Sequence, residues 1–483
     1  MRFPRSLIAI VMLVTACGGS DSTELEVSQD KVLAGKTTQL TPAEVFAAAA
    51  PSVVFVEVPD GTGSGVLLSN GYVVTNAHVV GHYPTVRLFT SLGEMTDVPV
   101  YAKDWSTDLA LIGPLRFDEL DGEIPAVDVG SSATLATGDG VYLIGYPGEV
   151  ETEPVPAMTS GILSRRRVAP CLGMTFLQTD AMLASGQSGG VLVDASGQVI
   201  GISGLGGFAD TNFGLVLAVE DVLAAIEGLD EGSGNFLMTE SEGSLSQSVE
   251  VPISDSVGYL VEITKDQPFL AVTASSSDGE DIWINIYTWD GFPPVWHWGQ
   301  GEVDYIYDDI NARDEAQPGF FFADAFEDGT AESLEVSLEP GIYVVAIGTN
   351  SHSPTTVSVE ASSHLTLLED LEPPFKKLVM GKSVTGALNH YEDVDNYRVD
   401  LQKGDTVRIQ MFSIADPMMS LYLRDELVAS NDDASIGLYG YGAEIVFEAN
   451  ARGLYDLEVA AYHSSTKTYV LSLDHADAET PSC

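Results

Sequence analysis

The sequence predicts an all-β protein in which two antiparallel barrels precede two β-sandwich modules. Short β-branched or alternating runs, separated by Gly, Pro, Asn and Asp, recur along most of the chain. No long helical pattern separates these runs, and the C-terminal half contains a repeat. With 483 residues, of which 45% are hydrophobic, the chain is long enough to build several domains with a core in each.

Residues 1–16 have the pattern of an export signal. Arg2 and Arg5 precede an apolar run that is too short to span a bilayer, and small residues follow it. The junction "VTAC" resembles the lipobox of bacterial lipoproteins, in which the cysteine becomes the lipidated first residue. We therefore expect a lipid anchor on Cys17, a flexible tether over 17–40, and an exported protein on the periplasmic or cell-surface side of the envelope. An ordinary cleaved signal is the alternative.

Residues 41–229 are expected to form the first domain. "TPAE" at 41–44 is a capping box with a proline at the first helical position, which predicts a short helix over 41–50. Two successive series of strand-like runs follow, the first up to "DLALIG" and the second from "DGVYLIGYP" to "GLVLAV". They predict the paired barrels, and "EDVLAAIEGL" predicts a helix that closes the domain.

The repeat in the C-terminal half predicts two similar β-sandwiches. "EPGIYVVAIGTNSHSPTTVSVEAS" aligns with "ARGLYDLEVAAYHSSTKTYVLSLDHA", so that Gly341 matches Gly453 and Tyr343 matches Tyr455. In the second copy, "DVDNYRVDLQKGDTVRIQM" and "MSLYLRDELVASNDD" resemble the bacterial pre-peptidase C-terminal domain. The first copy carries an aromatic insertion whose tryptophans form either a binding face or a cover for the core: Trp283, Trp289, Trp296 and Trp298.

The composition of the chain sets the module boundaries. "DEGSGN" at 230–235 is predicted to be a linker. We expect module 1 over 236–363, module 2 over 375–476 and a tail over 477–483.

The charge balance excludes nucleic acid and anionic lipid headgroups as ligands. The chain has 71 Asp and Glu against 21 Lys and Arg, a formal net charge of −50. The basic cluster "RRR" at 165–167 is expected in a solvated loop, with docking of an acidic partner as the alternative. No cofactor is expected to be required, but four aspartates are weak candidates for Ca²⁺: Asp393, Asp395, Asp432 and Asp433.

Three residues far apart in the chain have the chemistry of a catalytic triad. Ser188 lies among glycines in "LASGQSGGVLVD", His78 ends the hydrophobic strand of "GYVVTNAHVV", and Asp108 begins that of "STDLALI". The order His, Asp, Ser is that of chymotrypsin, and it places the first two in the first barrel and the serine in the second. His82 forms an H-x-x-x-H pair with His78, but the glutamate and helix of a zinc motif are missing.

These motifs resemble the HtrA/Deg family of trypsin-fold serine proteases over residues 41–228, through "PSVVFVEV", "GTGSGVLLSNGYVVTNAHVV", "STDLALI", "TSGILS", "LQTDAMLASGQSGGVLVDASGQVIGI" and "FGLVLAVEDV". The resemblance implies a chymotrypsin-like double β-barrel. It also implies that Ser188 attacks a scissile carbonyl, His78 exchanges the proton and Asp108 orients His78. The oxyanion would bind to backbone N–H groups of Gly186, Gln187 and Ser188. Two sandwich modules replace the family's usual PDZ domains.

The primary specificity pocket is expected to be apolar. Trypsin-like preference needs an aspartate six residues before the nucleophile, and this chain has Met182 there. A small or medium apolar substrate side chain would fit such a pocket, whereas Lys or Arg would lose its hydration without gaining a partner. The expected lining is Met182, Leu183, Ser203, Gly204 and Leu205.

The sequence therefore predicts an exported serine endopeptidase that acts on unfolded or damaged envelope or extracellular proteins. The alternative from another class is a non-catalytic surface binding protein that uses the protease fold as a scaffold. A chaperone-like holding role of the sandwiches alongside proteolysis is a third possibility. The sequence leaves open the oligomeric state, and whether Cys171 and Cys483 pair or stay free thiols.

Overall fold

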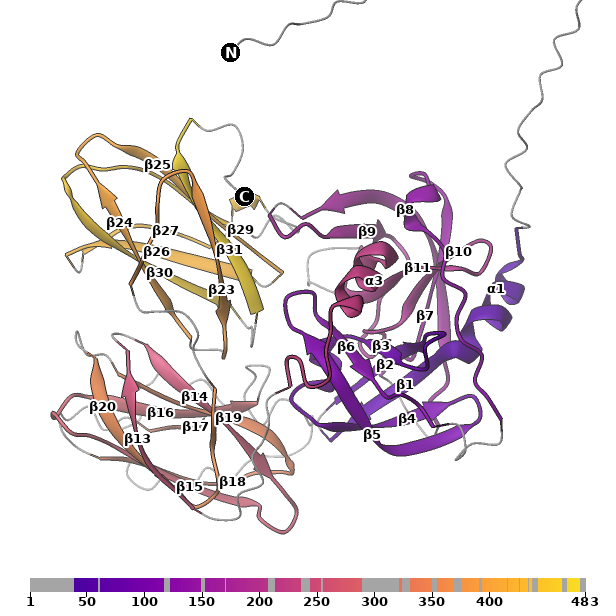
Figure 1. Ribbon diagram of the computed structural model, residues 1–483, viewed down its shortest axis with the longest axis horizontal. Coiled ribbons are helices and arrows are strands. Elements are labelled where there is room, and N and C mark those ends of the chain that lie inside the picture. Colours follow the sequence, from indigo (N-terminus) through magenta and orange to yellow (C-terminus); the bar gives the residue numbers. More distant parts are fainter. Residues whose placement is uncertain are drawn as a thin grey trace, which may run out of the picture. The chain divides into compact units, whose positions relative to one another are not determined.

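The computed structural model describes residues 39–477 apart from positions 60, 117–121, 149–152, 170, 207–212, 236–243, 253–254, 289–320, 324–330, 350–353, 369–374, 391–392, 415, 425, 433, 437–441 and 463–466. Leu40–Cys483 is one compact unit of the chain. It contains two closed barrels followed by four open sheets (Figure 1). The all-β class and the double barrel predicted from the sequence are confirmed.

Barrel 1 closes in the spatial order β1-β2-β3-β6-β5-β4. The hairpin between its second and third strands has the expected turn chemistry, because Gly71 has a φ of 86° and the side-chain oxygen of Asn70 accepts the N–H of Tyr72 at 3.2 Å. The strands are β1 (Val53–Val58), β2 (Gly61–Leu67), β3 (Val73–Thr75), β4 (Thr85–Thr90), β5 (Gly93–Asp104) and β6 (Leu109–Ile112).

Barrel 2 closes in the order β10-β11-β12-β9-β8-β7. All of its pairings are antiparallel, as in barrel 1. The strands are β7 (Gly140–Gly145), β8 (Ala157–Val168), β9 (Thr175–Thr179), β10 (Val191–Asp194), β11 (Val199–Gly206) and β12 (Gly214–Ala218).

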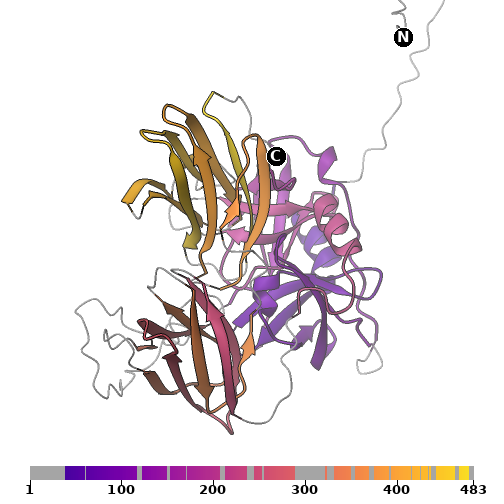
Figure 2. The same ribbon diagram turned by 60° about the vertical axis from the view of Figure 1, so that its left-hand side comes forward.

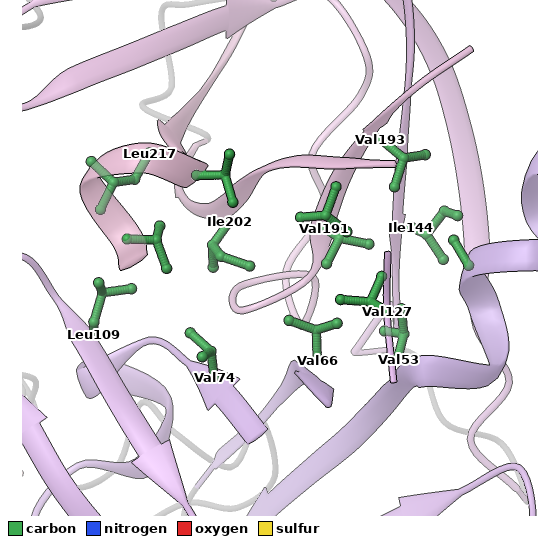
Figure 3. Close-up of a cluster of buried hydrophobic side chains, with 14 of the residues drawn as sticks. Val53, Val66, Val74, Leu109, Val127, Ile144, Val191, Val193, Ile202 and Leu217 are labelled. Atoms are coloured by element: carbon green, nitrogen blue, oxygen red, sulfur yellow. The ribbon is translucent and has the colours of Figure 1, made fainter. Parts of the chain in front are cut away.

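The two barrels share one apolar core. Figure 3 shows Val66 and Val74 of barrel 1 in the same cluster as Val191 and Ile202 of barrel 2, and all four side chains are buried. A fully buried Val or Leu side chain contributes about 1.5–3 kcal/mol, so this cluster joins the barrels strongly. The strand that carries Val74 leads into the segment of His78, and Val191 follows the loop of Ser188.

Short helices flank the barrels. Helix α1 (Pro42–Ala49) has the predicted capping box, in which Thr41 Oγ1 accepts the N–H of Glu44 and the Glu44 carboxylate accepts the N–H of Thr41. Helix α3 (Val219–Glu227) ends before Gly228, as predicted. None of the helices in the described ranges has the length and apolar character that crossing a membrane would require.

The predicted linker at 230–235 is fastened to barrel 1. Ser233 O accepts the N–H of Lys103 at 2.7 Å, and the N–H of Gly232 donates to Tyr101 O at 2.8 Å. The Asn235 side chain donates to Val100 O at 3.0 Å. The glycines and acids of this segment favour a loop, but backbone hydrogen bonds to β5 fix its path.

Module 1 consists of two facing sheets, in the orders β13-β20-β15-β18 and β17-β16-β19-β14-β21 (Figure 2). Of the four tryptophans singled out above, Trp283 lies on β16, and the other three fall outside the described residues. The strands are β13 (Leu245–Val251), β14 (Ser256–Ile263), β15 (Phe269–Ser276), β16 (Ile282–Thr288), β17 (Phe321–Ala323), β18 (Glu332–Ser337), β19 (Gly341–Thr349), β20 (Thr355–Ala361) and β21 (Thr366–Leu367).

Module 2 also has two sheets, in the orders β22-β24-β30-β26-β27 and β23-β31-β25-β29-β28. The strands are β22 (Lys376–Lys377), β23 (Lys382–Leu388), β24 (Asp395–Leu401), β25 (Thr406–Ser413), β26 (Asp416–Leu423), β27 (Glu426–Asn431), β28 (Ala434–Ile436), β29 (Gly442–Glu448), β30 (Gly453–Tyr462) and β31 (Lys467–His475).

The aligned residues of the two repeats occupy equivalent positions. Gly341 begins β19, and Gly453 begins β30. The Tyr343 hydroxyl donates to Glu339 O at 3.0 Å, and the Tyr455 hydroxyl donates to Ala451 O at 2.9 Å. Each tyrosine therefore ties its strand to a carbonyl of the preceding turn in the same way, which is the corner arrangement common in β-sandwiches.

Candidate active site

His78 and Asp108 meet because the strands beside them pair. β3 leads into the short helix α2 (Ala77–Val80), which carries His78, and Asp108 immediately precedes β6. Antiparallel pairing places Thr75 opposite Ala110, so the two side chains come together at one end of this ladder. His78 Nδ1 lies 2.7 Å from Asp108 Oδ2, and the backbone N–H of His78 donates to Asp108 Oδ1 at 3.0 Å.

The contact with Asp108 assigns the tautomer of His78. A carboxylate can only accept hydrogen bonds, so Nδ1 carries the proton and Nε2 has a free lone pair. The Asp108 side chain is 3% exposed, whereas that of His78 is 35% exposed. The pair therefore consists of a buried carboxylate and an imidazole whose outer nitrogen is open to a substrate.

Asp108 is held in an unusual backbone conformation. Its φ is 56°, in the left-handed region, which costs a non-glycine residue about 1–3 kcal/mol. Its carbonyl oxygen accepts the N–H of Ala77 at 3.1 Å and the side-chain amide of Asn76 at 2.9 Å. Both carboxylate oxygens of Asp108 contact His78, so its side chain and its backbone carbonyl both bond to the segment that it positions.

The loop of Ser188 needs glycine at two positions. Gly186 and Gly189 have φ values of 84° and 80°. A Cβ atom on Gly189 would overlap the carbonyl oxygen of Ser64, and one on Gly186 would overlap the backbone of Gly148. The glycines around the serine thus serve a left-handed backbone and close approach to neighbouring strands.

Two amides of this loop are available to an anion. In the described part of the chain, the N–H groups of Gly186 and Ser188 donate to no protein acceptor. Gln187 is expected to supply a third donor to the oxyanion, but its N–H donates to Ala184 O at 3.1 Å within the loop. Gln187 is therefore removed from the expected set of oxyanion donors, and Gly186 and Ser188 remain.

The structure brings the Ser188 loop to the strand of His78. The N–H of Ser64 donates to Ser188 O at 2.7 Å, and Thr75 Oγ1 donates to Ser64 O at 2.6 Å. Thr75 lies three residues before His78 in the chain. Among the hydrogen bonds of the described residues there is none between the Ser188 hydroxyl and His78 Nε2. The structure therefore joins His78 and Asp108 of the predicted triad, and it holds Ser188 in a loop that is hydrogen-bonded to β2.

The predicted pocket residues have unequal roles. Met182 is 68% exposed and so does not form the buried floor expected of it, although its carbonyl accepts the Thr159 hydroxyl at 2.9 Å. Leu183 fills the space beside Gly214, where a Cβ atom would overlap Leu183 Cδ1. Leu183 therefore packs against β12 at Gly214.

The remaining pocket candidates lie on β11. The Ser203 hydroxyl is buried and donates to Gln187 O at 2.6 Å, which commits it to the nucleophile loop rather than to a substrate. A Cβ atom on Gly204 would overlap the side-chain amide of Asn76. The side chain of Leu205 lies outside the described residues.

The calcium candidates have other partners. The Asp393 carboxylate accepts the N–H of Asn389, and the Asp395 carboxylate accepts the Tyr469 hydroxyl. Asp432 is described, but Asp433 is not. Within the described ranges, no group of three or more His, Cys, Asp and Glu side chains has a geometry that could hold a metal ion.

The structure describes Cys171 and His82, but not the other two cysteines. Cys171 is disulfide-bonded, which excludes the free thiol, and Cys17 and Cys483 both lie outside the described residues. His82 is 2% exposed, and its pKa is held well below the usual value by burial and then by the charge of Lys103. That environment is a packed core position.

Sequence reasoning missed the residues that support the loop. Ser64, Thr75 and Asn76 are fully or almost fully buried. The Ser64 hydroxyl donates to Gly186 O, the Asn76 side-chain amide donates to Asp108 O, and the Thr75 hydroxyl donates to Ser64 O. The motif "GTGSG" offered a signal for Ser64, since a polar residue between glycines on a buried strand requires a partner.

The barrels and this site define a trypsin-fold peptidase domain. Residues 63–202 match the family model of the trypsin-like peptidase domain. Within that class the domain is HtrA/Deg-like. The serine protease HTRA1 of Xenopus tropicalis is 32% identical over 276 residues, which cover 50% of this chain and 58% of that protein.

A second relative and a solved structure are also similar to this chain. The mitochondrial serine protease HTRA2 of Bos taurus is 35% identical over 179 residues, which cover 33% of this chain and 37% of that protein. A solved serine endoprotease from Yersinia pestis is 27% identical, covering 39% of this chain and 66% of that one with a TM-score of 0.34. The chain thus spans less than two thirds of these relatives' lengths, and the family model matches within the two barrels.

Proposed function

We propose that this protein is a serine endopeptidase that uses Ser188, His78 and Asp108. The observation that carries the proposal is the His78–Asp108 pair, at 2.7 Å, beside a loop whose Gly186 and Ser188 amides have no acceptor in the described chain. The trypsin-like peptidase match and the HtrA relatives support the same reaction class.

The chemistry follows from the roles of these groups. Ser188 Oγ bonds to the scissile carbonyl carbon while its proton passes to His78 Nε2. The carbonyl oxygen becomes an oxyanion between the amides of Gly186 and Ser188, each of which contributes about 3–4 kcal/mol. The buried Asp108 carboxylate stabilises the imidazolium, which then protonates the leaving amine as the C–N bond breaks. Water releases the acyl group by the same steps in reverse.

The hydroxyl and the imidazole must come within hydrogen-bonding distance for this reaction. Both side chains are partly exposed, and neither Ser188 Oγ nor His78 Nε2 has another partner within the described residues, so no hydrogen bond there has to be broken for the two groups to meet. Catalytic hydrogen bonds are often long in unliganded enzymes and shorten in the substrate complex.

A fluorophosphonate probe tests the proposal directly. We expect the full chain to be labelled, and labelling to be lost in Ser188→Ala and in His78→Ala. Ser185→Ala is the matched control, because it removes a hydroxyl from the same loop and should keep the labelling. A wild-type chain that stays unlabelled would support the non-catalytic scaffold instead.

We further propose that the substrates are unfolded proteins cleaved after small or medium apolar residues. Leu183 beside Gly214 offers an apolar wall that narrows the space for a side chain. An apolar wall gives no partner for Lys or Arg. Mapping the cleavage sites of lysozyme in its native form and in its reduced and alkylated, unfolded form, with Ser188→Ala as the control, tests both the residue preference and the need for unfolding.

The proposal also covers the cellular location of the protein and the role of its two sandwich modules. Export with a lipid on Cys17 rests on residues 1–17, and the sandwiches are proposed to be pre-peptidase-like binding modules, with Ca²⁺ as an optional ligand. Cys17→Ser should move the protein from the membrane to the soluble fraction of bacterial cells. Its presence in the membrane fraction after that change would contradict the anchor.

A further inference from the structure

Two buried serine hydroxyls hold the backbone of the nucleophile loop. We propose that Ser64 and Ser203 are positioning residues for the oxyanion site: Ser203 aims the amide of Ser188 at the oxyanion, and Ser64 fixes the Gly186–Gln187 peptide between the two donors. This inference rests on the proposed peptidase function and adds two residues to its machinery. Both serines are fully buried, and neither lies near enough in sequence to the loop to be recognised as its support.

Ser203 orients the amide of Ser188. The Ser203 hydroxyl donates to the carbonyl oxygen of Gln187 at 2.6 Å, and the N–H of Gly190 donates to the same oxygen at 3.0 Å. A trans peptide is planar, so its N–H points away from its C=O. Because the peptide between Gln187 and Ser188 is held by its oxygen, the N–H of Ser188 must point to the opposite side of the loop.

Ser203 is itself well fixed. Its N–H donates to Gly190 O at 2.9 Å, and its carbonyl accepts the N–H of Gly189 at 2.8 Å. These two bonds join β11 to the loop on either side of the hydroxyl contact. The side chain therefore has a rigid base from which to hold the Gln187 carbonyl.

Ser64 holds the neighbouring peptide. Its hydroxyl donates to Gly186 O at 2.9 Å and accepts the N–H of Tyr146 at 2.8 Å, so both hydrogen-bonding roles of the group are used. The Gly186 carbonyl belongs to the peptide whose N–H, on Gln187, donates to Ala184 O. Ser64 thereby keeps the Gln187 amide turned into the loop, and it fixes the peptide that lies between those bearing the Gly186 and Ser188 amides.

The loop needs such bonds because its sequence gives little rigidity. Glycine adopts several backbone conformations at similar cost, so an unsupported peptide beside Gly186 can rotate. The Ser185 carbonyl is held by the N–H of Gly148 at 2.8 Å, and the Ser188 carbonyl by the N–H of Ser64 at 2.7 Å. Main-chain N–H groups thus hold the carbonyls of Ser185 and Ser188. The hydroxyls of Ser64 and Ser203 hold the carbonyls between them, those of Gly186 and Gln187.

The test compares three serine-to-alanine variants of the full chain. Ser64→Ala and Ser203→Ala remove the positioning hydroxyls. Ser52→Ala is the matched control, because Ser52 is 1% exposed and its hydroxyl has no hydrogen-bond partner in the described residues. For each chain, the maximal rate and half-saturating concentration of fluorophosphonate labelling, the pH profile of labelling and the thermal transition are measured.

We expect the maximal labelling rate to fall about 10- to 100-fold in Ser64→Ala and Ser203→Ala, since loss of one well-aimed donor costs about 10²–10³. The half-saturating probe concentration and the midpoint of the pH profile should not change, because neither probe docking nor His78 is altered. Ser52→Ala should match the wild type.

Several outcomes would overturn the inference. Labelling of both variants at the wild-type rate would show that the hydroxyls do not position the amides. A shifted pH midpoint would place their effect on His78 instead. Loss of the thermal transition would assign the hydroxyls to the stability of the fold. A wild-type chain that is not labelled would remove the proposed function, and this inference with it.

Discussion

Replacing Lys103 by methionine should stabilise the peptidase domain and remove part of its pH dependence. Lys103 lies on β5, is 2% exposed, and forms no ion pair within the described ranges. Burial lowers the pKa of its ammonium group from 10.5 to about 7. The Trp105 ring, with its centroid 6.0 Å from Nζ, offers only a weak cation–π contact.

The sign and size follow from proton linkage. The folded pKa lies below the unfolded one, so between pH 7 and 10.5 the unfolded chain binds more protons, and the free energy of unfolding rises with pH. A complete proton difference contributes about 1.4 kcal/mol for each pH unit. At the folded pKa the unfolded chain binds about half a proton more than the folded chain, and this difference approaches one proton as the pH rises. The free energy of unfolding therefore rises by about 2 kcal/mol between pH 7 and pH 9 because of Lys103.

Urea unfolding followed by circular dichroism measures this contribution. The stability advantage of Lys103→Met over the wild type should be largest near neutral pH and shrink by about 2 kcal/mol toward pH 9. The exposed Lys403, replaced by methionine, is the control and should show no such trend. An advantage that stays constant over this range, or one that grows with pH, would refute the reasoning.

Three further changes test the site. Asp108→Asn should keep the fold but lower the fluorophosphonate labelling rate about 10⁴-fold, because the amide no longer fixes the His78 tautomer; a rate near that of the wild type would contradict this role. Leu183→Ala should shift cleavage of casein toward larger apolar residues, since it opens the space beside Gly214, and an unchanged set of cleavage sites would remove Leu183 from the pocket. Gly189→Ala should lower the melting temperature and abolish labelling, because the new Cβ overlaps Ser64 O at a left-handed φ; normal labelling would show that the loop can move aside.

The sequence predicted the barrels and the His78–Asp108 pair because both depend on local patterns. Alternation and turn residues define short antiparallel strands, and the ends of such strands carry His78 and Asp108. The capping box of α1 could also be predicted, because it is a contact between residues only three apart. The left-handed φ of Asp108 could not be predicted, because it results from hydrogen bonds to a segment thirty residues away.

The features that the sequence did not give are long-range hydrogen bonds. Gln187 differs from its neighbours because its N–H donates within the loop. Met182 had the right spacing for a pocket floor, but spacing does not determine which way a loop residue faces. The composition marks Asp393 and Asp395 as acidic, but it does not indicate that their carboxylates accept hydrogen bonds from the Asn389 amide and the Tyr469 hydroxyl.

The hydrogen bonds between residues 232–235 and β5 have a practical consequence for anyone who wishes to isolate the catalytic half. Truncation at Leu229, where the last helix has ended, would discard the cover of Trp105, whose indole N–H donates to Gly234 O at 3.0 Å. It would also uncover part of the buried Lys103, whose backbone carbonyl and Cβ pack against Gly234. A recombinant fragment should therefore extend through Asn235, and shorter ones are expected to be poorly soluble.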